Sequence, residues 1–271
     1  HSDRMVLSFL GLGLDTTALG HGCFHPSHDR GFAGSGLQSQ RILNLMLIAQ
    51  NLSKHYPSAQ GWIKSLDEMD LEVKAGEFLA IRGHSGSGKT TLLLTLGAML
   101  RPSSGRVVFE GQDMYQCSSQ QRAAWRAEQI GFVFQMFHLM PYLSVLDNLC
   151  LHGRAKAGSM QRADTLLDTL NLKHRVNHLP HQLSAGERQR VAMARAMMAS
   201  PKLILADEPT GNLDPRHATE VCEHLRKFRD SGGTVILVTH GELASSFADR
   251  TIFLEQGRLL ETAEGHAQTA P

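Results

Sequence analysis

The stretch that decides the fold is Gly83-His84-Ser85-Gly86-Ser87-Gly88-Lys89-Thr90, or GHSGSGKT in one-letter code. It fits the pattern G-x-x-x-x-G-K-[S/T], which binds phosphate groups when a strand precedes it and a helix follows. The apolar residues 78–82 predict a strand before it. The apolar run at 91–100 predicts a helix after it, which should end near Pro102 because proline stops a helix. The loop therefore has the context that phosphate binding requires.

The residue types of this loop suit a nucleotide phosphate chain with Mg²⁺. Its glycines let backbone N–H groups turn toward an anion, and the following helix adds its partial positive charge. The Lys89 ammonium can reach the β and γ phosphates, and the Thr90 hydroxyl can bind Mg²⁺. We expect nucleotide contacts along the whole run: Gly83, His84, Ser85, Gly86, Ser87, Gly88, Lys89, Thr90 and Thr91.

Two carboxylates, Asp207 and Glu208, follow the apolar residues 203–206, which predict a buried strand. Ligands bind at the carboxyl ends of strands in open α/β sheets, so both side chains are expected beside the phosphate loop. Asp207 would hold Mg²⁺, and Glu208 would polarise the attacking water as a general base. Adjacent carboxylates beside a phosphate favour hydrolysis over phosphoryl transfer, which leaves a small-molecule kinase as the weaker alternative.

Composition narrows the class of protein. The chain has 271 residues, is 42% hydrophobic and 20% charged, and so suits a globular protein with a sizeable core. A net charge of +1 gives no general argument for nucleic-acid binding. The four cysteines form no C-x-x-C pair and are expected to be reduced thiols. No apolar run reaches the roughly 18–20 residues that span a bilayer, so another polypeptide would have to supply any pore.

The rest of the pattern alternates short apolar strands with helices and predicts an α/β fold, with a mostly parallel sheet covered on both faces. Strands are expected within 47–82 and at 106–110, 130–135, 202–209 and 234–240, with a closing hairpin at 250–261. Helices are expected at 115–129, 184–199 and 217–233. A further helical region, interrupted by polar residues, is expected at about 143–178. Clear patterning begins at Met46. We expect residues 1–45 to be a disordered or non-native extension, and residues 46–271 to form the folded domain.

The segment that discriminates between nucleotide-binding families is Leu183–Glu187, LSAGE, which RQRVAMARAM follows. Ser184 and Glu187 form an S-x-x-E capping box, so a helix should begin here. The segment resembles the signature motif of ABC-type ATPases, usually LSGGQ. Ala185 and Glu187 depart from that motif, and we expect both departures to be minor.

Other motifs of the same family occur in order over about residues 46–262. Gln135 resembles the Q-loop glutamine of the family, and His240 resembles the switch histidine. The segment LILADE at 203–208 resembles the Walker B segment followed by its catalytic glutamate. The resemblance implies catalytic roles for Glu208, His240 and Gln135, and Mg²⁺ ligands in Thr90, Gln135 and Asp207. It also implies a P-loop NTPase core with an antiparallel β subdomain and a helical insert at about 137–198. The resemblance also implies that Tyr56 stacks on the adenine of ATP, and Trp62 is the alternative aromatic residue for this contact.

A partner cassette follows from the same resemblance. In this family, the signature of one subunit faces the phosphate loop of another, so a head-to-tail dimer holds two ATP molecules. Ser184, Gly186 and Asp214 of the D-loop segment would then contact the nucleotide across the interface. The chain has one phosphate loop and one signature, which predicts a homodimer.

Within the family, LADEPTGNLD and LSAGERQRVAMARAM look most like the lipoprotein-release and macrolide-export group. That implies a transmembrane permease partner, a peripheral location on the cytoplasmic face of the inner membrane, and no nucleic acid. Phe137, Leu139, Met140 and Tyr142 would either contact the permease or pack within the helical insert.

The alternative is a soluble ABC-type ATPase of DNA repair or translation. Against it, the roughly 90 residues between phosphate loop and signature show no heptads or cysteine pairs.

Overall fold

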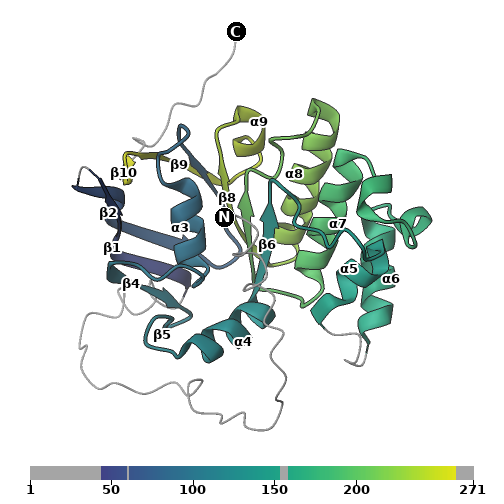
Figure 1. The fold of residues 1–271 in the computed structure, drawn as a ribbon, viewed down its shortest axis with the longest axis horizontal. Coiled ribbons are helices and arrows are strands. Elements are labelled where there is room, and N and C mark those ends of the chain that lie inside the picture. The colour runs from purple at the N-terminus through teal and green to yellow at the C-terminus, as the bar shows by residue number, and fades with distance from the viewer. Residues whose placement is uncertain (1–43, 60, 153–157, 261–271) are drawn as a thin grey trace.

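The computed structural model describes residues 44–59, 61–152 and 158–260, and the expected extension at 1–45 lies almost entirely outside them. Two β-sheets organise the fold (Figure 1). The antiparallel sheet has the order β2-β1-β4-β5, from strands β1 (Leu45–Ser58), β2 (Gly61–Lys74), β4 (Ser104–Phe109) and β5 (Gln112–Asp113).

The second sheet has six strands in the order β10-β9-β3-β8-β7-β6. Its members are β3 (Phe78–Arg82), β6 (Ile130–Phe134), β7 (Leu203–Asp207), β8 (Thr234–Thr239), β9 (Arg250–Glu255) and β10 (Arg258–Leu260). All neighbours pair in parallel except the closing hairpin β9–β10. The predicted mostly parallel sheet is confirmed.

Helices cover this sheet on both faces. They are α3 (Lys89–Leu96), α4 (Ser119–Gln129), α5 (Val145–Leu149), α6 (Ser159–Thr169), α7 (Ala185–Met197), α8 (Pro215–Asp230) and α9 (Glu242–Ser245). Short 3₁₀ turns lie at Cys150–His152, Lys173–Arg175 and Pro180–Gln182. Among the helices that the structure describes, none is both long and apolar enough to cross a bilayer.

Alternation along the central strands explains the two-sided core. In β7, Leu203 and Leu205 pack on α3 and the antiparallel sheet, whereas Ile204 and Ala206 pack on the side of α5 to α8. Successive side chains point to opposite faces of a strand, so a continuous apolar run is buried on both sides. Figure 1 shows α3 and the antiparallel sheet on one side, and α5 to α8 on the other.

Some element ends differ from the prediction. Strands β1 and β2 have 14 residues each and form one long hairpin. Helix α3 ends at Leu96, because Gly97 packs against Phe132 and Leu205 and Ala98 takes a left-handed φ of 53°. Helix α4 begins at Ser119, after a capping box of Ser118 and Gln121 that the sequence analysis missed although S-x-x-Q is visible there.

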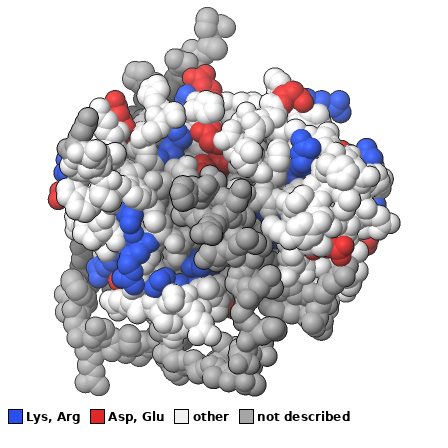
Figure 2. All heavy atoms as spheres, viewed as in Figure 1, with Lys and Arg blue, Asp and Glu red and all other residues white. Residues whose placement is uncertain are grey.

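Arginines and a lysine satisfy backbone carbonyls beside α4. Lys54 donates to the carbonyl of Arg101, Arg122 to that of Cys117, and Arg126 to that of Ala98 just after α3. On the face seen in Figure 2, blue side chains gather between the antiparallel sheet and α4, while the rest of the face mixes both signs with neutral surface. Lys54, Arg122 and Arg126 thus supply hydrogen bonds to carbonyls near the ends of local structure.

Shortening Leu205 tests how far the site-bearing strand depends on its core. Leu205 is fully buried two residues before Asp207 and contacts the turn at Gly97. Leu205→Ala is expected to lower the free energy of unfolding by ~2–5 kcal/mol in urea denaturation, because it leaves a cavity. Leu243→Ala, on the surface of α9, is the control and should cost no more than about 0.5 kcal/mol. Equal effects would contradict the two-sided core.

Candidate functional site

The phosphate loop connects β3 to α3 and depends on two glycines in left-handed conformations. Gly86 has φ 81° and Gly88 has φ 106°, a region that other residues rarely adopt. A Cβ on Gly88 would lie 2.2 Å from the carbonyl oxygen of Ser65 in β2, so the loop packs directly on that strand. Glycine at 88 thus lets α3 begin at Lys89 with its N-terminus turned into the site.

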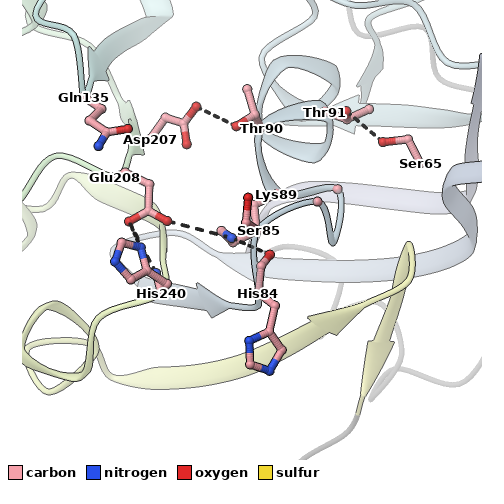
Figure 3. Close-up of a pocket in the computed structure, with 12 residues that line it drawn as sticks. Ser65, His84, Ser85, Lys89, Thr90, Thr91, Gln135, Asp207, Glu208 and His240 are labelled. Atoms are coloured by element: carbon pink, nitrogen blue, oxygen red, sulfur yellow. Dashed lines mark hydrogen bonds and ion pairs between the residues drawn. The ribbon is translucent and has the colours of Figure 1, made fainter. Parts of the chain in front are cut away.

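Parallel register brings the predicted motifs to one edge of the sheet. Arg82 pairs with Thr239, Asp207 with Val238 and Phe134 with Asp207, so the strands β3, β8, β7 and β6 end together. The residues that follow these ends surround a pocket of about 640 Å³. Its lining, drawn in Figure 3, is Ser65, His84, Ser85, Gly86, Gly88, Lys89, Thr90, Thr91, Gln135, Asp207, Glu208 and His240.

Lys89 lies inside the loop that presents it. Its buried ammonium donates to the carbonyls of Gly83 at 2.7 Å and His84 at 2.9 Å, and it lies 3.8 Å from Glu208 Oε1. The loop thus holds a cation at the centre of the pocket, where a phosphate oxygen could replace a carbonyl as its partner.

Thr90 and Asp207 supply the oxygen atoms that suit Mg²⁺. The Thr90 hydroxyl donates to Asp207 Oδ2 at 2.9 Å, and Gln135 lies beside them in the pocket (Figure 3). Burial raises the pKa of Asp207, and the neighbouring Glu208 charge acts in the same direction. In the described part of the chain, no group of three or more His, Cys, Asp or Glu residues is arranged to hold a metal ion by itself. The donor set therefore fits a hard cation that takes its other ligands from phosphate and water.

Glu208 is held in place by donors from Thr239, the last residue of β8, and from His240, which follows it. His240 Nδ1 lies 2.9 Å from Glu208 Oε2, and the same oxygen lies 3.3 Å from both the His240 backbone nitrogen and the Thr239 hydroxyl. Glu208 has φ 46°, a strained value for a residue with a side chain. The carboxylate is thereby fixed beside Lys89 with its second oxygen facing the pocket, as a general base requires (Figure 3).

The segment after Gln135 is held by the signature helix. Phe137 and His138 have left-handed φ values of 59° and 47°, and their carbonyls both accept hydrogen bonds from Arg195 of α7. Burial lowers the pKa of Arg195 to about 10, so it is still charged at neutral pH. Leu139 packs on the core of the insert, whereas Tyr142 is 72% exposed.

The signature turn forms the predicted capping box. The Ser184 hydroxyl accepts from the Glu187 backbone at 3.1 Å, and Glu187 Oε2 accepts from the Ser184 backbone at 2.8 Å. Gly186 packs on α8, where an added Cβ would lie 2.6 Å from the His217 ring. Asp214 caps the same helix through the backbone of His217. Ser184, Gly186 and Asp214 do not line the pocket described above.

Three other predicted nucleotide contacts lie outside the pocket lining. Gly83 contributes its carbonyl to Lys89, and the Ser87 hydroxyl is buried without a hydrogen-bond partner among the described residues. Tyr56 lies on the β1–β2 hairpin opposite Ile63 and is partly exposed, beside a Trp62 that is 72% exposed. Their contacts with a nucleotide stay predictions.

Ser65 is a pocket residue that was not predicted. Its hydroxyl donates to Thr91 Oγ1 at 2.9 Å and it lines the pocket. Ser65 belongs to β2, which reaches the loop through the long hairpin and carries no motif. No sequence signal pointed to it.

Replacing Asp207 is expected to change the stability of the folded protein and its ATP hydrolysis in opposite directions. Its folded-state pKa is raised above the ordinary value of 3.8, so the ionised carboxylate destabilises the folded protein at neutral pH. Asp207→Asn should therefore raise the thermal unfolding midpoint without nucleotide at pH 7, and this gain should shrink as the pH falls toward 4. Mg²⁺-dependent ATP hydrolysis should fall by about a hundredfold or more.

Asp168→Asn, on the exposed surface of α6, is the matched control and should leave hydrolysis unchanged. A less stable Asp207→Asn protein at pH 7 would contradict the electrostatic account.

Comparison with known proteins adds sequence evidence to this geometry. The ABC transporter family model matches residues 66–211. The chain is 43% identical over 230 residues to a lipoprotein-releasing system ATP-binding protein of Shewanella sp. (strain MR-7), covering 83% of this chain and 99% of the relative. A protein of the same description from Rhodopirellula baltica is 44% identical over 211 residues, covering 76% of this chain and 92% of the relative.

Two solved structures are similar in fold to most of this chain. One is a dimeric bacterial ABC transporter cassette, with a TM-score of 0.75. The other is a dimeric cassette in a post-hydrolysis state, bound to ADP and Pi, with a TM-score of 0.74. Each is 36% identical and covers 80% of this chain and 97% of its own.

Proposed function

Because this chain belongs to the ABC transporter family, as a subunit that binds and hydrolyses ATP, we propose that two copies work together beneath a separate permease. The observation that carries the proposal is that the signature residues do not line the phosphate-loop pocket of their own chain. The phosphate loop, Glu208 and His240 share a pocket, whereas the signature residues Ser184 and Gly186 lie outside it. A second copy related by two-fold symmetry would bring each signature to the other's pocket.

The chain's own residues have clear tasks in ATP hydrolysis. Lys89 exchanges its carbonyl partners for phosphate oxygens and balances their charge. Thr90, Asp207 and Gln135 would hold Mg²⁺, which supplies further neutralisation of the phosphate charge when bound. Glu208 orients a water and takes its proton, while His240 fixes that carboxylate and donates to the γ-phosphate. In the partner's site, Ser184 and the Gly186 backbone N–H would donate to phosphate from a helix N-terminus.

The work driven by this hydrolysis is proposed to be export or lipoprotein release. The two curated relatives named above are lipoprotein-releasing system proteins. A permease contact is supported by the exposed side chains of Met136, which follows Gln135 directly, and Tyr142 in the same segment. Large exposed apolar side chains beside a nucleotide-contacting residue suit a partner surface. The cassette would then lie on the cytoplasmic face of the inner membrane. Nothing in the comparisons favours a soluble repair or translation ATPase.

Glu208→Gln should separate ATP binding from hydrolysis. The amide keeps the shape of the carboxylate but cannot take a proton, so hydrolysis should fall by about a hundredfold or more while ATP still binds. Light scattering should show an ATP-dependent dimer of this variant. Adding Ser184→Asp should abolish the dimer, because aspartate caps a helix as well as serine but places a negative charge toward the partner's phosphate. A dimer that tolerates Ser184→Asp would contradict the head-to-tail arrangement.

The partner is tested by affinity purification of Glu208→Gln from native membranes with ATP. Recovery of a permease with a large extracytoplasmic domain would support the lipoprotein-release type of work. Recovery of soluble proteins, ribosomes or DNA alone would overturn the permease proposal and leave the ATPase chemistry intact.

A further inference from the structure

The signature of this chain carries a carboxylate, Glu187, where the motif it resembles has an amide. We propose that Arg175 is a positioning residue for ATP hydrolysis, which neutralises Glu187 so that the signature turn can approach the partner's phosphates. This inference rests on the head-to-tail dimer proposed above. It concerns a contact between two segments that no motif connects.

The contact between Arg175 and Glu187 is short and sheltered. Arg175 Nε donates to Glu187 Oε1 at 2.7 Å, while Glu187 Oε2 accepts from the Ser184 backbone at 2.8 Å. The Glu187 side chain is only 12% exposed and that of Arg175 34%. Both carboxylate oxygens are therefore occupied, one by the cation and the other by the turn that would meet the partner.

Glu187 cannot lose its charge by protonation at neutral pH. Burial raises its pKa, but hydrogen bonds from Ser184 and Arg175 outweigh burial and lower the pKa to about 2. A carboxylate that is always ionised, three residues into a helix that faces a triphosphate, would repel it. Arg175 supplies the balancing charge.

Other charged groups near the turn have different partners. Arg188 donates to the carbonyl of Leu183 and lies over Phe137, and Arg190 pairs with Glu220 of α8. His174 Nε2 is 3.7 Å from Glu187 Oε1, but that side chain is mostly exposed and the distance exceeds a hydrogen bond. Arg175 is thus the permanent cation in direct contact with Glu187 in the described structure.

The turn that carries Arg175 is itself fixed. The 3₁₀ turn Lys173–Arg175 is followed by Val176 and His178, whose carbonyls accept from the backbones of Leu146 and Val145 in α5. The guanidinium also lies 3.2 Å from His178 Nε2. Arg175 therefore joins the signature turn to a segment that is itself bonded to the start of α5. Removing Arg175 would leave the carboxylate without its cation but would keep the capping serine.

The test is a double-mutant cycle in the Glu208→Gln background. Arg175→Gln is expected to weaken ATP-dependent dimerisation at least tenfold in sedimentation equilibrium, while ATP affinity of the monomer stays unchanged. Glu187→Gln alone should change dimerisation less than threefold. The double variant should return to within threefold of Glu187→Gln, because no unbalanced charge is left. In the otherwise native chain, ATPase activity should follow the same order.

Lys173→Gln is the matched control, since it removes a cation from the same turn that pairs with Asp164 and Asp168 instead. It should leave dimerisation unchanged. If Arg175→Gln does not fold, Arg175→Lys should fold and dimerise within about threefold of the parent, because it keeps the charge.

Two results overturn the inference and can be told apart. A parent that forms no ATP-dependent dimer overturns both the proposed function and this inference. A parent that dimerises normally while Arg175→Gln has no effect, or is not rescued by Glu187→Gln, overturns only the role of Arg175.

Discussion

Parallel pairing of β3, β8, β7 and β6 is the constraint on which the site depends. Each strand carries one element of the chemistry just beyond its carboxyl end, and the register places those ends at one edge. The strands are buried on both faces, so a shift of one residue would exchange the side chains of two different cores. The apolar core thereby sets the distances between Lys89, Asp207, Glu208 and His240, although none of these residues belongs to it.

At that edge, charged residues are stabilised by one another. Thr90 donates to Asp207, and Glu208 lies between Lys89 and His240. Gathering these groups at the sheet edge costs free energy in two ways. Burial raises the pKa of Asp207, and Glu208 takes a left-handed backbone conformation. Such strain persists where the surrounding structure determines it, here through the sheet and the donors Thr239 and His240 at the end of β8. A phosphate chain would bring its own negative charge to Lys89 and the α3 N-terminus, which are already oriented toward it.

The sequence predicted the succession of strands and helices along the chain, and it predicted that Asp207 and Glu208 end a strand beside the phosphate loop, because short local patterns encode both. The phosphate loop, the apolar run before Asp207 and the S-x-x-E box at Ser184 each need only a few adjacent residues. Contacts made over long separations had no such signal. Ser65 reaches the pocket only because β1 and β2 form a long hairpin, and Arg195 fixes the strained Phe137 from another helix. Local pattern also misplaced the end of α3, which tertiary packing of Gly97 determines.

The two departures from the family signature have different physical consequences. Ala185 is the first residue of α7, next to the capping serine, and its methyl group is partly exposed, so the structure accommodates it. The neighbouring Gly186 has no such freedom, because a Cβ there would lie 2.6 Å from the His217 ring, which is closer than Cβ atoms pack. Glu187 is accommodated differently from Ala185, because Arg175 in the preceding turn places an opposite charge beside its carboxylate. The side chain of Ala185 is tolerated because it is partly exposed, and no side chain fits at position 186. The carboxylate of Glu187 requires the opposite charge of Arg175. The tolerance of each position is therefore set by what lies opposite it in space, which the motif alone does not contain.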